Sequence, residues 1–156
     1  MTAPRRIIAV RKSGIHGRGV FALRRIPKGR TIIRYRGRLV THEEADVDAL
    51  DNGHTFLFIL NEHYVIDASN EGNSARWINH ACEPNCEAFQ IESPSGDPRR
   101  DRIVIDSKRP IRAGEELTYD YRIETNERIT PGLKKLWPCR CGSRKCRGTM
   151  LRRRRS

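Results

Sequence analysis

The sequence has few aromatic residues and no long apolar run. Of its 156 residues, 37% are hydrophobic and 6% are aromatic, and no segment approaches the ~18 apolar residues that a membrane-spanning helix needs. Near the start, only Ile7 to Val10 form an apolar stretch, which is too short for the core of a secretory signal peptide. We therefore expect a soluble intracellular protein of one domain, with a core small enough to benefit from a metal ion.

Acidic residues are absent from the first forty positions, although the middle of the chain is rich in them. Residues 1–40 hold twelve Lys and Arg, and residues 41–98 hold twelve acidic residues against one basic residue, Arg76. Residues 99–156 hold eighteen basic and seven acidic residues, and the net charge is +12. Basic ends indicate an anionic partner such as nucleic acid, whereas an acidic middle indicates a basic partner such as a lysine-rich peptide. The alternative is that each patch is a solvated face of a compact domain.

The five cysteines do not suit a disulfide framework, because their number is odd and no secretion signal precedes them. Cys139, Cys141 and Cys146 lie close together, which is typical of a zinc site that lacks one ligand. Cys82 and Cys86 are the other two cysteines, and either can supply the fourth ligand. A histidine is a less favoured alternative beside three thiolates. With either cysteine, the C-terminal cluster must fold back onto the Asn79–Asn85 loop and close over whatever that loop binds.

The pattern of the chain predicts a mainly β, β-rich α+β fold. One helix is predicted from Thr41 to Leu50, with Glu44 completing a capping box. A second, short helix is predicted at Ser74–Asn79, and Ser93–Pro98 is typical of a hairpin tip. Runs of β-branched and aromatic residues bounded by Gly, Pro and Asn predict strands at 6–10, 19–23, 31–35, 55–60, 64–68, 86–91 and 102–107.

The segment His16–Ala22 has the G-x-G-x-x-A spacing of a dinucleotide-binding turn. Such a turn must open a helix, but Pro27 and Gly29 leave no room for one, and Val20 and Phe21 favour a strand. We therefore predict a tight turn between two strands. Its glycines would let the backbone approach a ligand closely.

The segment Gly72–Cys86 crowds Asn, His, Cys and Pro together without hydrophobic periodicity. Such crowding is costly unless the polar groups satisfy one another or a ligand. We expect Arg76, Asn79 and His80 to converge on one ligand, and the alternative is a polar loop network around Pro84.

Two tyrosines, Tyr119 and Tyr121, are spaced so that they point to one side of a strand. Their rings can wall a narrow channel, or they can belong to an ordinary aromatic strand face.

In this order, these motifs resemble the SET-domain family of protein lysine methyltransferases with a post-SET zinc cluster. The resemblance runs from about Arg6 to Leu151 and implies small curved sheets around a pseudoknot. It implies a SET domain at 5–122, a linker at 123–137, a post-SET zinc segment at 138–151 and an Arg-rich tail at 152–156.

The resemblance also implies an activity, transfer of a methyl group from S-adenosylmethionine (SAM) to a lysine of a basic protein. The substrate would be a histone or another nucleic-acid-associated protein, methylated mainly once or twice, in a bacterial cytoplasm or a eukaryotic nucleus. The alternative function is a zinc-containing module that binds nucleic acid or chromatin through its Arg-rich ends, with a degenerate SAM site.

Roles for single residues follow from the resemblance, and the glycine turn and Arg76 add to them. Tyr121 and Tyr119 would be catalytic, and Tyr35 and Tyr119 would wall the substrate channel. Phe56 replaces a tyrosine found in close relatives, and Ala81 replaces a serine. The expected zinc ligands are Cys82, Cys139, Cys141 and Cys146, which leaves Cys86 as a free thiol. The expected SAM-binding residues are His16, Arg18, Gly19, Phe56, Arg76, Asn79, His80, Tyr121, Arg140 and Leu151, with Met150 as an alternative to Leu151.

Overall fold

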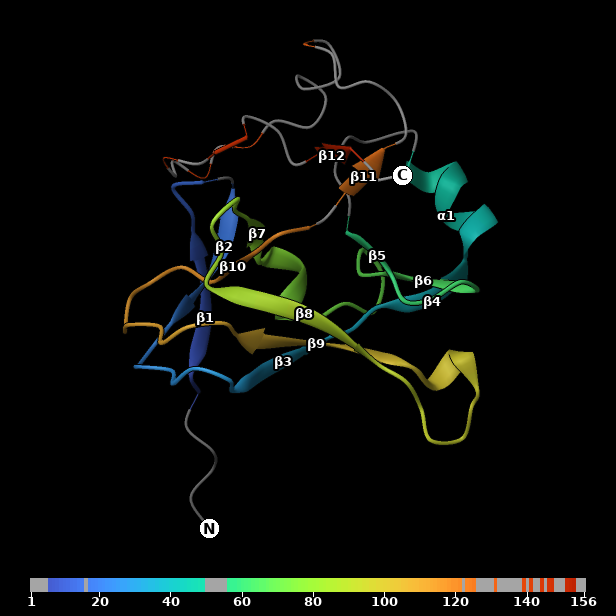
Figure 1. The fold of residues 1–156 in the computed structure, drawn as a ribbon, viewed down its shortest axis with the longest axis horizontal. Coiled ribbons are helices and arrows are strands. Elements are labelled where there is room, and N and C mark those ends of the chain that lie inside the picture. The colour runs from blue at the N-terminus through green and yellow to red at the C-terminus, as the bar shows by residue number, and fades with distance from the viewer. Residues whose placement is uncertain are drawn as a thin grey trace.

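The computed structural model describes residues 6–15, 17–49, 56–121, 123–125, 131, 139, 141, 144, 146–147 and 151–153, without the side chains of 46–49, 123–125 and 151–153. The described part of the chain is built mainly of short strands, in two three-stranded and three two-stranded sheets (Figure 1). This confirms the predicted β-rich class. No helix among the described residues is long and apolar enough to span a bilayer.

The glycine motif lies in a hairpin, as its sequence predicted. Strands β1 (Ile8–Lys12) and β2 (Arg18–Ala22) pair antiparallel, and the backbone N–H of Ser13 donates to the carbonyl of Gly17 across the turn, at 2.8 Å. Gly17 has a φ of 44°, which a residue without a Cβ adopts at no steric cost. The rejection of a dinucleotide-binding turn is therefore confirmed.

A three-stranded antiparallel sheet forms the second unit, in the order β3 (Thr31–Tyr35), β9 (Arg102–Ser107), β8 (Cys86–Ile91). All three strands match the predicted runs. The predicted hairpin tip joins β8 to β9, where Gly96 donates to the carbonyl of Ser93 at 3.0 Å. A short 3-10 helix, η2 (Pro98–Arg100), precedes β9.

The third unit is the sheet β4 (Arg38–Thr41), β6 (Tyr64–Asp67), β5 (Leu57–Ile59), flanked by helix α1 (His42–Ala49). Thr41 Oγ1 accepts the backbone N–H of Glu44 at 3.3 Å and donates to its carboxylate at 3.1 Å. The predicted helix start is thus confirmed. Strand β4 was not predicted from the sequence, because it runs directly into the helix without a turn.

The second predicted helix is shorter than expected. Helix η1 (Ser74–Trp77) is a single 3-10 turn, and Ile78 is extended with φ −68° and ψ 119°. The prediction was wrong for Asn79, which begins strand β7 (Asn79–His80) and pairs in parallel with β10 (Thr118–Tyr119). The physical reason is tertiary, since the backbone N–H of Ala81 also donates to the carbonyl of Tyr119 at 3.3 Å.

This parallel pair, the β7–β10 crossing, joins segments about forty residues apart, as the expected pseudoknot would. Close to it, strands β11 (Ile123–Thr125) and β12 (Leu151–Arg153) form another parallel pair. The core between the units is apolar, and its largest fully buried side chains are Val20, Ile26, Ile78, Cys86, Ile105, Ile111 and Leu117.

Candidate active site and metal centre

Tyr121 lies where β7 and β10 meet. Its hydroxyl donates to the carbonyl of Ile78 at 2.5 Å, and its backbone N–H donates to Nδ1 of His80 at 3.0 Å. The two rings meet edge to face, with centroids 5.3 Å apart. Strand β10 ends at Tyr119, so these contacts, and not strand alternation alone, fix the position of Tyr121.

Aromatic rings extend from Tyr121 in a row. The centroid of Tyr121 lies 4.8 Å from that of Tyr119, Tyr119 lies 6.0 Å from Phe58, and Phe58 lies 5.1 Å from Tyr35. The hydroxyl of Tyr35 donates to the carbonyl of Phe56 at 3.0 Å. Within the described residues, the hydroxyl of Tyr119 has no hydrogen-bond partner. The structure therefore brings the three expected tyrosines together and adds Phe58, whose isolated position in a strand carried no signal.

The three phenols are held in their protonated form. Burial is the main cause, and it raises the pKa of Tyr121, Tyr35 and Tyr119 above the ordinary value. Tyr35 and the carboxylate of Glu116 add to the rise in the pKa of Tyr121, and the carboxylate of Asp67 adds to it at Tyr35. At neutral pH this row of rings offers hydroxyl groups that donate and accept hydrogen bonds, without a negative charge.

His80 is neutral in this arrangement. Burial lowers its pKa to about 4, although the negative charge of Asp120 acts to raise it. Because Nδ1 accepts the N–H of Tyr121, the ring proton belongs on Nε2. That atom lies 3.7 Å from Sγ of Cys82, so His80 connects Tyr121 to the cysteine cluster.

The side chain of Asn79 holds the β1–β2 hairpin. Its amide nitrogen donates to Ser13 Oγ at 3.1 Å, to the carbonyl of Arg18 at 3.0 Å and to Glu116 at 2.8 Å. Ser13 Oγ also contacts both carboxylate oxygens of Glu116, at 2.7 and 2.9 Å. A Cβ at Gly19 would collide with that carboxylate, so the close approach at Gly19 is to Glu116.

Arg18, Arg76 and Phe56 gather around Trp77. The guanidinium of Arg76 lies 4.7 Å from the Trp77 ring centroid, and that of Arg18 lies 5.5 Å away. Phe56 meets Trp77 edge to face at 5.4 Å. Two cations on an aromatic platform suit a ligand with a carboxylate, which the amino-acid part of SAM carries.

The candidate metal centre consists of Cys82, Cys139, Cys141 and Cys146, whose sulfur atoms all lie within 4.8 Å of one another. Tetrahedral zinc with Zn–S bonds of about 2.3 Å places its sulfurs about 3.8 Å apart, and Cys82 Sγ lies 3.7 Å from Cys139 Sγ. Burial raises the pKa of the Cys82 and Cys139 thiols, so their thiolate forms need a nearby positive charge. The donor set therefore fits one structural Zn²⁺ ion.

The fourth cysteine of the cluster is Cys82 and not Cys86. Cys86 begins β8, opposite Ser107, and is only 1% exposed. Burial raises the pKa of its thiol to about 12, so it remains a protonated core residue.

Some expected residues cannot be placed. His16, Arg140 and Met150 lie outside the described residues, and of Leu151 only the backbone in β12 is described. Their expected roles remain predictions.

Two residues that hold the site together were missed by the sequence interpretation. Asn85 is 2% exposed, and its side chain donates to the carbonyl of Glu116 and accepts the N–H of Thr118, both at 2.8 Å. Arg147 contacts Asp120 beside Tyr121. The crowded polar segment was a signal for Asn85, but a basic residue in a basic segment gave none for Arg147.

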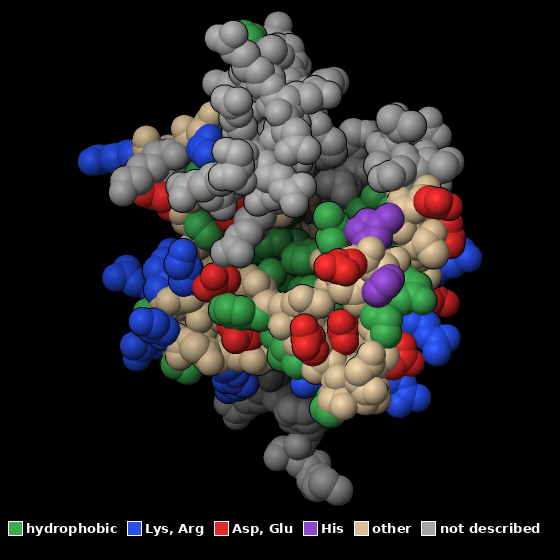
Figure 2. All heavy atoms as spheres, turned by 45° about the vertical axis from the view of Figure 1, so that its right-hand side comes forward, with side chains coloured by type: hydrophobic (Ala, Val, Ile, Leu, Met, Phe, Trp, Pro, Cys, Tyr) green, Lys and Arg blue, Asp and Glu red, His purple; other side chains and the backbone are tan. Residues whose placement is uncertain are grey.

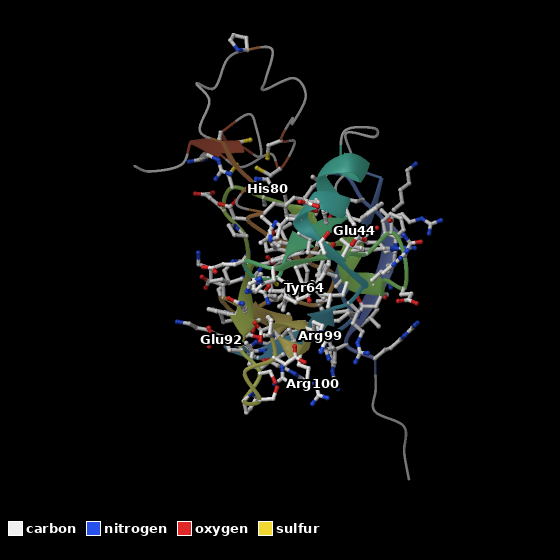
Figure 3. The ribbon with its side chains drawn as sticks, turned by 90° about the vertical axis from the view of Figure 1, so that its right-hand side faces the viewer. Glu44, Tyr64, His80, Glu92, Arg99 and Arg100 are labelled. Atoms are coloured by element: carbon white, nitrogen blue, oxygen red, sulfur yellow. The ribbon has the colours of Figure 1, made fainter. Side chains whose placement is uncertain are left out.

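The charged surface supports the idea of a basic partner. Figure 2 shows acidic side chains around hydrophobic ones near the centre of one face, with Lys and Arg mainly toward its sides. In Figure 3, Glu44 lies on α1 and Glu92 on the β8–β9 hairpin, with Arg99 and Arg100 at the hairpin tip. The acidic residues from the middle of the sequence thus lie on two units of the fold. At the tip of the β8–β9 hairpin the acidic surface ends at Arg99 and Arg100.

Comparisons with known proteins agree with this geometry. The family model described as "SET domain" matches residues 17–122. A relative from Mycosarcoma maydis named histone-lysine N-methyltransferase, H3 lysine-4 specific, is 40% identical over 141 residues, 87% of this chain and 9% of that protein. Histone-lysine N-methyltransferase SETD1 of Drosophila melanogaster is 39% identical over 145 residues, 89% of this chain and 8% of that protein.

A human relative, histone-lysine N-methyltransferase 2B, is 39% identical over 145 residues, 90% of this chain and 5% of that protein. The chain therefore spans less than a tenth of the length of these three relatives. The match covers the β7–β10 crossing and Tyr121, and the four-cysteine cluster is compatible with a post-SET zinc site. The chain belongs to the SET-domain family.

Proposed function

We propose that this chain is a SAM-dependent protein-lysine N-methyltransferase that acts on a lysine of a basic protein. The observation that carries the proposal is the row of protonated tyrosines beside the β7–β10 crossing, within a SET domain. Bound SAM would supply an electrophilic methyl group on a sulfonium cation. A pure binding module would have no need for this row of buried hydroxyl groups.

The chemical task of the site is to make a lysine nucleophilic. A free lysine amine has a pKa of ~10.4 and is mostly protonated at neutral pH. Aromatic walls formed by Tyr35, Phe58 and Tyr119 would remove water from the amine, which lowers its pKa and favours the neutral form. The same walls would hold the amine in line with the methyl group, and such positioning is a large part of the rate that an enzyme supplies.

Tyr121 would orient the reacting groups through its hydroxyl, which is anchored on the carbonyl of Ile78. A deprotonated tyrosine base is unnecessary, in agreement with its raised pKa. Arg18 and Arg76 would bind the carboxylate of SAM from the Trp77 platform.

Tyr119 would limit the number of methyl groups transferred. Its hydroxyl has no partner among the described residues, so it is available to hold a water molecule or the amine in the channel. An occupied position there crowds out a second or third methyl group. We therefore propose mainly monomethylation, with some dimethylation.

The test is transfer of label from methyl-labelled SAM to a panel of lysine-rich proteins, including histones, with Tyr121→Phe as the matched variant. The expected result is label on lysine of one substrate, lost in Tyr121→Phe while SAM binding measured by calorimetry is kept. Binding of SAM without transfer to any basic protein, or equal transfer by Tyr121→Phe, would refute the proposal.

A further inference from the structure

Arg147 links the cysteine cluster to Tyr121, and nothing in the sequence marked it. It follows Cys146 directly, and its guanidinium makes two contacts with Asp120, at 3.1 Å to Oδ2 and 3.3 Å to Oδ1. Asp120 is the residue before Tyr121. We propose that Arg147 is a positioning residue. Its two hydrogen bonds to Asp120 hold Tyr121 in place when the cysteine cluster is docked on the SET domain.

The Arg147–Asp120 ion pair is partly buried and is made by two hydrogen bonds. The side chains of Arg147 and Asp120 are 29% and 17% exposed, unlike the surface pair Arg99–Asp97, in which Arg99 is 67% exposed. Exposed pairs contribute little to stability, whereas a planar guanidinium on both carboxylate oxygens fixes direction as well as distance. The contact therefore sets the orientation of the chain at Asp120.

A second set of contacts connects Arg147 to Tyr121 through Cys82 and His80. The backbone N–H of Arg147 donates to Sγ of Cys82 at 3.3 Å, and Nε2 of His80 lies 3.7 Å from the same sulfur. His80 in turn accepts the N–H of Tyr121. Tyr121 is thus connected by two routes to Sγ of Cys82, a candidate zinc ligand: through His80, and through Asp120 and Arg147.

A functional consequence follows from the order of these contacts. The residues around Cys146 and those around Tyr121 are distant in sequence. The Arg147–Asp120 ion pair therefore forms only when the C-terminal segment is folded against the SET domain. Arg147 would make Tyr121 competent only in that docked state. The inference rests on the proposed methyl transfer for its kinetic consequence, but its geometric part stands on its own.

The experiment compares Arg147→Met with Arg144→Met, which removes an equal charge from an exposed side chain of the same segment. Zinc content, kcat, KM for SAM and peptide, and hydrogen exchange at the Tyr121 amide are measured for both. We expect Arg147→Met to keep its zinc, to lose roughly tenfold in kcat with little change in KM, and to exchange the Tyr121 amide several-fold faster. Arg144→Met should match the unmodified protein in each measurement.

Two further variants separate positioning from a general structural role. Asp120→Asn combined with Arg147→Met should lose no more kcat than the larger single loss, because both changes break one contact. Arg147→Lys keeps the charge but cannot make both hydrogen bonds to Asp120. Its kcat and its Tyr121 amide exchange rate should lie between those of Arg147→Met and the unmodified protein.

The inference is overturned if Arg147→Met matches Arg144→Met in kcat and amide exchange, if the two losses add, or if Arg147→Met loses its zinc. Absence of methyl transfer by the unmodified protein would count against the proposed function alone. The exchange rates at Tyr121 would then decide the inference by themselves.

Discussion

Asn85 joins the loop after Cys82 to the segment before Tyr121, and Asn85→Ala removes that connection. The side chain donates to the carbonyl of Glu116 and accepts the N–H of Thr118, both at 2.8 Å. Because Asn85 is 2% exposed, water cannot easily replace either bond. The substitution therefore leaves two backbone groups without their partner at the crossing of β7 and β10.

The size of the effect follows from those two groups. An unsatisfied buried donor or acceptor costs about 1–3 kcal/mol, so we expect a loss of about 3 kcal/mol in the free energy of unfolding. A domain of this size has a total of about 5–15 kcal/mol. With a urea dependence of about 2 kcal/mol per molar, the unfolding midpoint should fall by about 1.5 M.

Urea unfolding with saturating zinc provides the measurement, and the exposed Asn70 provides the control. Asn70→Ala removes two long side-chain contacts of an exposed residue, with Asp67 at 3.3 Å and Ser69 at 3.4 Å, and should change the stability by less than about 0.5 kcal/mol. A loss below about 1 kcal/mol for Asn85→Ala would refute the idea that this side chain holds the crossing together.

A second variant tests the direction of the hydrogen bonds. Asn85→Asp keeps the acceptor for the Thr118 N–H but places a carboxylate against the carbonyl of Glu116. That contact and burial raise the pKa of the new carboxyl, so the folded state binds the proton more tightly than the unfolded state. The stability of this variant should therefore increase as the pH falls from neutrality toward the unfolded-state pKa of about 4, and no increase would contradict the assigned donor and acceptor.

Four further outcomes are expected. Tyr119→Phe should shift the product toward dimethyl- and trimethyl-lysine in mass spectra, and trimethyl-lysine from the unmodified protein would contradict the role of Tyr119. Because burial raises the pKa of Tyr35, Tyr119 and Tyr121, kcat/KM should increase from about pH 7 to about pH 9 as the free substrate amine loses its proton, and a fall over that range would contradict the raised tyrosine pKa values. Cys82→Ser should lower the zinc content measured by mass spectrometry below about one ion per chain, whereas Cys86→Ser should leave it unchanged. Finally, kcat/KM for a basic peptide should fall between ~0.05 M and ~0.15 M salt, and a constant value would exclude electrostatic attraction by the acidic face.

Short-range sequence patterns were sufficient for much of the fold. Strands β3, β8 and β9 match the predicted runs, because β-branched residues between turn residues define a strand locally. The capping interaction of Thr41 with Glu44 depends on residues three positions apart, and it located the start of α1. Strand β7 has only two residues and no such local signal, and it was missed. For β10, the spacing of Tyr119 and Tyr121 indicated a strand but not its parallel partner.

The site was only partly open to the same reasoning. Three closely spaced cysteines indicated a metal centre, but spacing left both Cys82 and Cys86 as the fourth ligand. The tertiary structure identifies Cys82 as the fourth cysteine of the cluster, because strand β8 buries Cys86 opposite Ser107 and leaves Cys82 in the preceding loop.

The sequence by itself determined the residue types of the site, the order of its motifs and the local elements that carry them. The tertiary structure alone decided which of those residues meet. The Tyr121 hydroxyl reaches a carbonyl 43 residues away, and the Ser13 hydroxyl reaches a carboxylate 103 residues away. Such contacts depend on packing whole sheets against one another, and no local propensity encodes them.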